Sequence, residues 1–240
     1  MTIKSLAVLA LTIVGSTLSA QNAALAINPE LETTTEKLIS GFDGIPSERR
    51  AELEELGDFM FEQAQQQGTF NALFVCTHNS RRSHLADLWF KYGLYYFGLP
   101  QFESFSGGTE ATAFNPKAIA AVQRAGFTVD VDPAQKNPVV SITPKKFPIW
   151  NMMSKVYTHE SNPKSNFVAV MVCSDADKSC PAVDGAVGRF TIPYNDPRYF
   201  DNTPSERKKY DETVTLIGTE MLFLTSYIKD QSVAQKESAK

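Results

Sequence analysis

Short apolar runs alternate along this chain with stretches in which apolar residues recur every three or four positions. The short runs predict buried β-strands, and the periodic stretches predict amphipathic helices. The expected strands are residues 72–75, 102–105, 127–131, 167–172 and 190–192, and the expected helices are residues 83–97, 116–125 and 206–227. Strands that alternate with helices form parallel sheets through right-handed crossovers. We therefore expect an α/β domain with residues 167–172 as a central buried strand.

Other regions depart from this alternation. Residues 29–67 are polar and helix-prone, with a break at residues 40–46, and the second helix carries an apolar stripe typical of a packing face. Its members are Leu53, Leu56, Phe59, Met60 and Ala64. Residues 132–166 contain five prolines, and we expect an added hairpin or a lid there, formed by residues 139–142 and 147–150. Residues 229–240 predict a polar, frayed tail.

The first 26 residues have the pattern of a secretory signal peptide. Lys4 is the only charge before Glu30, residues 6–14 are mostly apolar, and small residues predict cleavage after Ala20 or Ala26. The apolar core is too short to span a bilayer comfortably. We expect an exported, periplasmic protein that is not embedded in a membrane. The expected organisation is a signal peptide (1–26), an N-terminal helical extension (27–68), an α/β domain (69–228) and the tail (229–240).

The strongest chemical pattern lies where the strand at residues 72–75 ends. Cys76 follows it, and after five further loop residues Arg82 and Ser83 open a helix. Backbone N–H groups of such a loop can converge on one point, where the helix dipole and the Arg82 guanidinium add positive potential. A tetrahedral oxyanion fits that cradle, and the same field favours a Cys76 thiolate, hence a nucleophile. A buried cysteine before an ordinary helix is the alternative, but it does not explain the spacing of Arg and Ser.

The segment CTHNSRRS (76–83) resembles the phosphate loop of low-molecular-weight protein tyrosine phosphatases and of the arsenate reductases that share their fold. The resemblance implies a single three-layer domain with a central, mainly parallel four-stranded sheet, to which the helical extension is added. It also implies that Cys76 attacks the oxyanion and that the Ser83 hydroxyl donates to the thiolate. The residues implied to bind the oxyanion or shape its loop are Thr77, His78, Asn79, Ser80, Arg81 and Arg82.

A second segment, CSDADKSCP (173–181), resembles the redox segment of thioredoxin-coupled arsenate reductases, and GTEATAFNPKAI (108–119) resembles the same family. That family implies that Cys173 attacks the Cys76 adduct and that Cys180 resolves the resulting disulfide. A thioredoxin-like protein then acts as the external dithiol, with no bound cofactor. Asp196, in YNDPRYF, matches the family's general acid, although Asp-Pro alone is a common turn.

Composition narrows the classes of partner. A net charge of −4 and a pI near 5.5 argue against a broad nucleic-acid-binding surface. His84 and His159 have no ligand-like spacing with the cysteines, so we expect no metal site. Two loop residues depart from the family pattern: Arg81 stands where relatives commonly carry a second cysteine, and His78 replaces a usual glycine.

Three hypotheses remain, and all assume the oxyanion cradle. The leading one is arsenate reduction, because three cysteines occupy three family positions. The second is a phosphatase in which Cys76, Arg82 and Asp196 hydrolyse a phosphomonoester and the other two cysteines form a disulfide. Export favours this alternative, since a cytosolic reductant would not reach the protein. The third is a non-enzymatic protein that binds oxyanions or responds to redox conditions.

Overall fold

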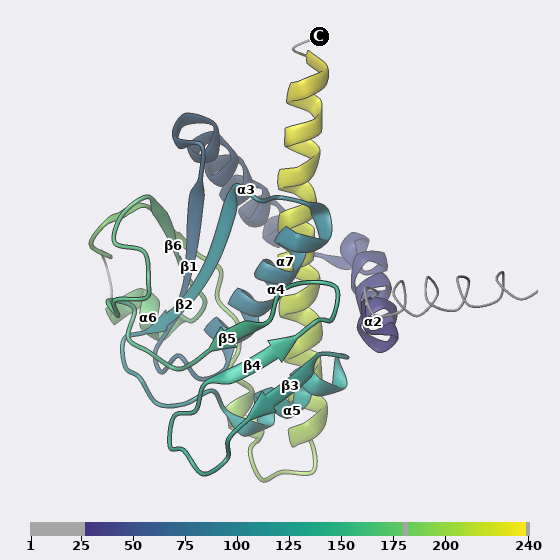
Figure 1. The fold of residues 1–240 in the computed structure, drawn as a ribbon, viewed down its shortest axis with the longest axis vertical. Coiled ribbons are helices and arrows are strands. Elements are labelled where there is room, and N and C mark those ends of the chain that lie inside the picture. Colours follow the sequence, from purple (N-terminus) through teal and green to yellow (C-terminus); the bar gives the residue numbers. More distant parts are fainter. Residues whose placement is uncertain (1–26, 180–181, 239–240) are drawn as a thin grey trace, which may run out of the picture.

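Four parallel strands form the central sheet, in the order β2-β1-β6-β7. They are β1 (Phe70–Cys76), β2 (Phe102–Gly108), β6 (Phe167–Met171) and β7 (Ala186–Thr191). The computed structural model describes residues 27–179 and 182–238 (Figure 1). The interior strands β1 and β6 are almost entirely buried, as their continuous apolar sequences predict. The expected fold, a four-stranded parallel sheet flanked by helices, is confirmed.

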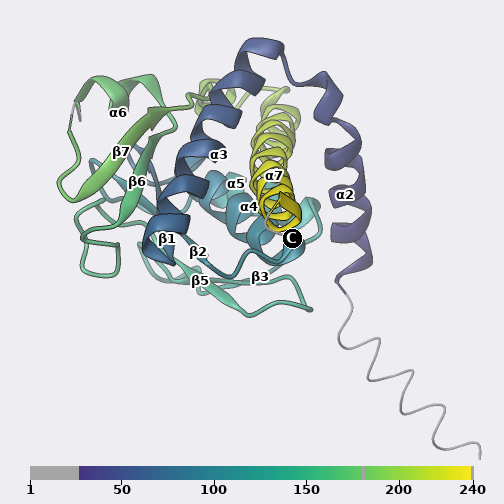
Figure 2. The ribbon, with the colours of Figure 1, turned by 90° about the horizontal axis from the view of Figure 1, so that it is seen from above.

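The helices gather around one long C-terminal helix, α7 (Glu206–Ser238). It packs against α4 (Arg82–Phe97), α3 (Ser47–Gln67) and α5 (Pro116–Arg124), and Figure 2 shows it end-on among them. Leu222 and Leu224 of α7 and Trp89 of α4 are fully buried. The sequence placed the end of this helix at Tyr227, whereas the helix continues to Ser238.

The N-terminal extension completes the core of the α/β domain. Its first helix, α2 (Pro29–Ser40), packs against α7, and Thr35 hydrogen-bonds the hydroxyl of Tyr92 in α4 at 2.9 Å. A short 3₁₀ helix, η1 (Phe42–Gly44), then leads into α3. The stripe predicted to be a packing face in α3 is buried, apart from the partly buried Phe59, whose ring lies 6.0 Å from that of Phe70 in β1.

Three further strands form a separate antiparallel sheet, in the order β3-β4-β5. They are β3 (Thr128–Val131), β4 (Val140–Thr143) and β5 (Trp150–Met152). The expectation that residues 127–131 join the parallel sheet is therefore wrong. A parallel connection needs a crossover of a dozen or more residues, usually a helix, but β3 leads through a proline-rich turn directly into β4. Of the two expectations for residues 139–150, the hairpin is confirmed.

Two short helices lie beside the carboxyl ends of the strands: α6 (Ser174–Ser179) follows β6, and η2 (Pro197–Phe200) follows β7. The predicted signal peptide, residues 1–26, lies outside the described residues. Within the described ranges, none of the helices has both the length and the apolar character needed to cross a membrane.

Candidate active site

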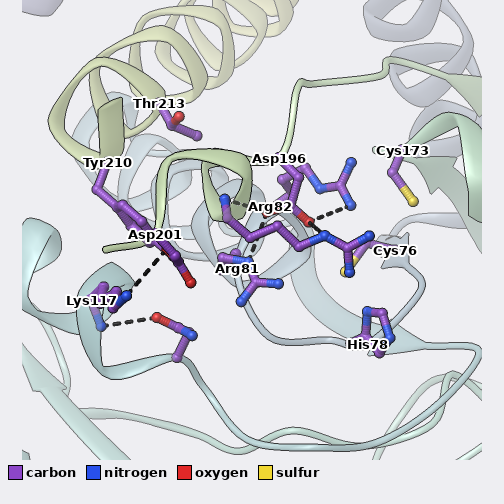
Figure 3. A network of polar contacts seen from close by, with 12 residues as sticks. Cys76, His78, Arg81, Arg82, Lys117, Cys173, Asp196, Asp201, Tyr210 and Thr213 are labelled. Atoms are coloured by element: carbon purple, nitrogen blue, oxygen red, sulfur yellow. Dashed lines mark hydrogen bonds and ion pairs between the residues drawn. The ribbon is translucent and has the colours of Figure 1, made fainter. Parts of the chain in front are cut away.

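Three segments meet at the carboxyl edge of the central sheet. Cys76 is the last residue of β1, Cys173 lies two residues beyond β6, and Asp196 lies five residues beyond β7. Because these strands are parallel neighbours, their carboxyl ends share one edge, which is where α/β sheets bind ligands. Figure 3 shows the three side chains together in one close view. The sheet order thus brings together residues that are up to 120 positions apart in the sequence.

The loop between Cys76 and α4 has its carbonyl groups bonded to surrounding segments. The carbonyl of Cys76 accepts from the backbone N–H of Thr109 (3.1 Å), and that of Thr77 accepts from the N–H of Glu110 (2.8 Å). The carbonyl of His78 accepts from the hydroxyl of Ser154 (3.2 Å), and that of Ser80 accepts from the N–H of Asn115 (2.9 Å). Within the part of the chain that the structure describes, no backbone N–H of residues 77–81 donates to a backbone carbonyl. The carbonyl oxygens are thus occupied while the N–H groups stay available, which suits the loop to binding an anion.

Asn79 fixes the shape of this loop and orients Ser83. Its backbone adopts φ 43°, in the left-handed region that asparagine tolerates. Its side-chain Oδ1 accepts from the backbone N–H of Lys155 at 2.8 Å, and its Nδ2 donates to Ser83 Oγ at 2.9 Å. Ser83 Oγ lies 3.1 Å from Cys76 Sγ. Since Ser83 Oγ already accepts from Asn79, its own hydrogen is free to point at the sulfur, an arrangement that stabilises a thiolate.

Two arginines bind the carboxylate of Asp196. Arg82 Nη2 donates to Oδ2 at 2.9 Å, and Arg81 Nε donates to Oδ1 at 2.8 Å. Burial by itself raises the pKa of Asp196, but the positive charges of Arg82 and Arg81 outweigh it and hold that pKa below its ordinary value. Arg82 Nη1 also donates to Tyr194 O at 3.0 Å. These two bonds use two of the five N–H donors of Arg82, which leaves three for an oxyanion.

These groups line a small hollow, called here the oxyanion hollow. It is lined by Cys76, His78, Ser80, Arg81, Arg82 and Asp196. The His78 ring is partly exposed at this hollow, and its Nε2 lies 3.8 Å from Glu110 Oε2. Nucleophile, acid and cations therefore converge on one small space.

Cys173 lies beside the same loop. It is fully buried, and its Sγ accepts from Ala176 N at 3.3 Å and lies 3.6 Å from Thr77 Oγ1. Cys76 and Cys173 are both free thiols. The structure thus brings two of the three predicted relay cysteines to one loop. Cys180, the third, lies outside the described residues, and its role stays a prediction.

Comparison with known proteins decides the family. The chain is 31% identical over 124 residues to arsenate reductase 2 of Staphylococcus epidermidis. The aligned segment covers 52% of this chain and 76% of the relative. The chain is 30% identical over the same length to an arsenate reductase of Staphylococcus aureus, with the same coverage. The chain belongs to the arsenate reductase family. It is therefore a member of a family of enzymes.

No model of a protein family matches the chain. Among solved structures, a mutant of YwlE from Bacillus subtilis aligns with a TM-score of 0.46 and 18% identity, over 66% of this chain and 97% of YwlE. The thioredoxin-dependent arsenate reductase of Corynebacterium glutamicum aligns with a TM-score of 0.35 and 15% identity, over 78% of this chain and 92% of its own. The family assignment rests on the sequence relatives.

The arsenate reductase family pattern also makes the unusual features of this chain visible. Arg81 was expected to carry its charge at the rim of the cleft; it lines the hollow, and its largely buried side chain is bonded to Asp196. Its predicted role in oxyanion binding stays a prediction. The sequence gave no sign of Tyr194 and Lys155, which position Arg82 and Asn79 through backbone atoms that any residue supplies. Within the described residues, no three His, Cys, Asp or Glu side chains are grouped to hold a metal ion.

Proposed function

We propose that this protein reduces arsenate to arsenite through a cysteine relay that begins at Cys76. One observation carries the proposal: the sulfur of Cys76 is hydrogen-bonded at the base of the oxyanion hollow, and a second buried free thiol, Cys173, lies against the next residue of the same loop. A phosphatase needs only the first of these sulfurs. A thiol-driven reduction needs the second within reach of the first.

The first step is a displacement at arsenic. The Cys76 thiolate attacks arsenate, an S–As bond forms, and one oxygen leaves as water after it gains a proton. Arg82 and the loop N–H groups stabilise the negative charge of the other oxygens. In this proposal Asp196, which also lines the hollow, faces the leaving oxygen, and a second hydroxyl of arsenate supplies the proton.

The second step transfers two electrons. The Cys173 thiolate attacks the sulfur of Cys76, an S–S bond forms, and the electron pair of the S–As bond stays on arsenic. Arsenic passes from the +5 to the +3 state and leaves as arsenite, while two thiols become one disulfide. Cys180 then attacks Cys173 and frees Cys76, and an external dithiol reduces the Cys173–Cys180 disulfide. A thioredoxin-like protein is the proposed donor, and export through residues 1–26 would make it a donor outside the cytosol.

Phosphomonoester hydrolysis is the second candidate. The oxyanion hollow contains a nucleophile, a guanidinium and a carboxyl group, which suffice for a cysteinyl-phosphate mechanism without either other cysteine. Tyr199, whose side chain is 70% exposed, lies three residues after Asp196 and could contact an aryl group. In this case Cys173 would be dispensable.

The two functions separate in three variants assayed with arsenate and a dithiol, and with an aryl phosphate. The relay predicts that Cys180→Ser is arrested as a Cys76–Cys173 disulfide, visible by mass spectrometry after arsenate addition. Cys173→Ser should lose arsenate turnover, and Cys76→Ser should lose every activity. Multiple turnover of arsenate by Cys180→Ser would refute the relay. Aryl phosphate hydrolysis by Cys173→Ser, without arsenate turnover by the wild type, would establish the phosphatase instead.

A further inference from the structure

Arg81 is placed to act on Asp196. It immediately precedes α4, and only 11% of its side chain is exposed. Its Nε binds Oδ1 of Asp196, whereas Arg82 binds Oδ2, so each carboxylate oxygen has its own guanidinium. The backbone N–H of Arg198 also donates to Oδ1, at 3.1 Å. Asp196 is thereby fixed as an ionised group, with both of its oxygens engaged.

The charged and titratable groups around Asp196 come from the loop and from four helices and strands. They are Arg81 of the loop, Arg82 of α4, Arg198 of η2, Tyr210 of α7 and the thiol of Cys76 at the end of β1. The Nε of Arg198 lies 3.8 Å from Oδ2, and 40% of its side chain is exposed, so water weakens its effect. The hydroxyl of Tyr210 donates to Asp201 and is not bonded to Asp196. A bound oxyanion draws on Arg82, which makes Arg81 the cation that remains with Asp196.

We propose that Arg81 is a positioning residue that holds Asp196 as a carboxylate and so favours arsenate over phosphomonoesters as the substrate. The inference rests on the proposed function, in which Cys76 is the nucleophile and Asp196 faces the leaving oxygen. It concerns selectivity, since Arg81 acts through Asp196 and not by contact with the reacting atoms.

The selectivity follows from the source of the proton. The arsenate monoanion, which is abundant near neutral pH, carries two hydroxyls, and a proton moved from one of them to the other lets water leave without an acid from the enzyme. A phosphomonoester dianion has no proton, so an alcohol with a poor leaving tendency departs only if an acid supplies one. General acids contribute roughly 10²- to 10⁴-fold to such steps. An enzyme that keeps Asp196 ionised loses this contribution for phosphomonoesters and keeps its activity toward arsenate.

The test compares Arg81→Gln and Arg81→Ala with Arg198→Ala as a matched control. Arg81→Gln removes the charge but still donates a hydrogen bond, so it keeps the test valid if the alanine variant folds poorly. At pH 7 the Arg81 variants should hydrolyse phenyl phosphate about tenfold faster than the wild type, with a basic limb of kcat/KM shifted to higher pH. Nitrophenyl phosphate, whose leaving group needs less protonation, should change much less. Arg198→Ala should keep the wild-type profile for both esters.

A measurement without turnover separates this inference from the proposed function. The ¹³C resonance of the Asp196 carboxyl, assigned with Asp196→Asn, should titrate at higher pH in Arg81→Gln than in the wild type. If the midpoint shifts in this way but neither arsenate nor esters are turned over, Arg81 does hold Asp196 as a carboxylate and the proposed function fails. An unchanged titration midpoint overturns the role of Arg81 in holding Asp196. Weaker binding of inorganic phosphate by Arg81→Gln, with an unchanged pH profile, also overturns it and makes Arg81 an oxyanion ligand.

Discussion

The guanidinium group of Arg49 donates a hydrogen bond to the carbonyl of Pro193, 2.8 Å away and 144 residues further along the chain. Arg49 lies in the first turn of α3, in the N-terminal extension, and its guanidinium carbon is 5.6 Å from the centre of the Tyr194 ring. The carbonyl of Tyr194 in turn accepts from Arg82. A residue outside the α/β domain thus holds the segment that positions an arginine of the active site.

Arg49→Ala should therefore reduce both activity and stability. Arg49 also lies 3.5 Å from the buried carboxyl of Glu220. Burial raises the pKa of Glu220, and the positive charge of Arg49 partly offsets that rise. Loss of the arginine leaves this group without its cation, and we expect a decrease in the free energy of unfolding of about 1–3 kcal/mol, measured by urea titration. We also expect a several-fold decrease in kcat/KM, because the segment before Asp196 is released.

Two further variants test this account of Arg49. Arg50→Ala is the matched control, since Arg50 donates to Phe42 O at 2.6 Å within the extension and packs on the Phe223 ring of α7, away from the segment before Asp196. It should lower stability while kcat/KM stays near the wild-type value. Glu220→Gln should restore part of the stability lost in Arg49→Ala. Equal losses of activity in Arg49→Ala and Arg50→Ala would show that the extension acts only through overall stability.

Ser83→Ala should slow the chemistry at Cys76 without weakening oxyanion binding. The variant removes the hydroxyl 3.1 Å from the sulfur, and a hydrogen bond to a charged group is worth roughly 1.5–3 kcal/mol. At about 1.4 kcal/mol per decade, kcat should fall tenfold or more. Binding of inorganic phosphate, measured by calorimetry, should change little. Ser104→Ala is the control, because this buried serine of β2 bonds Asp87 of α4 and does not line the hollow. The kcat of this variant should stay close to the wild-type value. An unchanged kcat in Ser83→Ala would exclude the serine from the chemistry.

His84 should make the protein less stable in acid. Its ring is fully buried and stacks on Phe114 with centroids 4.2 Å apart, and burial lowers its pKa from 6.5 to about 3. Between these values the unfolded chain carries a proton on His84 and the folded chain does not. The free energy of unfolding therefore falls as the pH falls, by up to ~1.4 kcal/mol per pH unit from this residue.

The measurement is urea unfolding of the wild type and His84→Phe between pH 7 and pH 4. The wild type should lose more stability than the variant as the pH falls. The free energy of unfolding of the variant should therefore rise steadily relative to that of the wild type. His159→Gln, at a less buried histidine, should follow the wild type. Parallel curves for the wild type and His84→Phe would contradict a buried, neutral His84.

Gly126→Ala should displace α2. Gly126 adopts φ +102°, and a Cβ there would lie 2.3 Å from the backbone nitrogen of Leu31. Its carbonyl also accepts from Asn28 Nδ2 at 2.8 Å, just before α2. We expect a loss of about 1–3 kcal/mol from overpacking, in addition to the conformational strain. Faster hydrogen exchange confined to α2 and its contacts on α4 would locate the change.

Gly68→Ala separates strain from the steric clash. Gly68 also has a positive φ, +79°, but a Cβ there would meet nothing within 4 Å. It should cost only the conformational strain, roughly 1–2 kcal/mol, with α2 exchange unchanged. If Gly126→Ala is no more destabilising than Gly68→Ala, the close approach of α2 is not a real constraint.

The chain itself determines the chemistry at Cys76. The run from residue 72 into Cys76, the spacing to Arg82 and the helix that follows are local features, and the structure reproduces each of them. The same holds for the two helices of the extension, whose break at residues 40–46 follows from local glycine and proline residues. Local patterns of this kind are readable because backbone geometry and periodicity act over a few residues.

Only the tertiary structure decided which partners these residues meet. β3 has the composition of a strand, but which sheet it joins depends on where its neighbours lie, and the sequence pattern assigned it to the wrong one. Arg81 lies next to Arg82 in the sequence, and nothing in the sequence showed that it binds a carboxylate 115 residues away. Pairings at such separations depend on the sheet order and on which buried charge needs a partner, and neither is encoded in the spacing of residues along the chain.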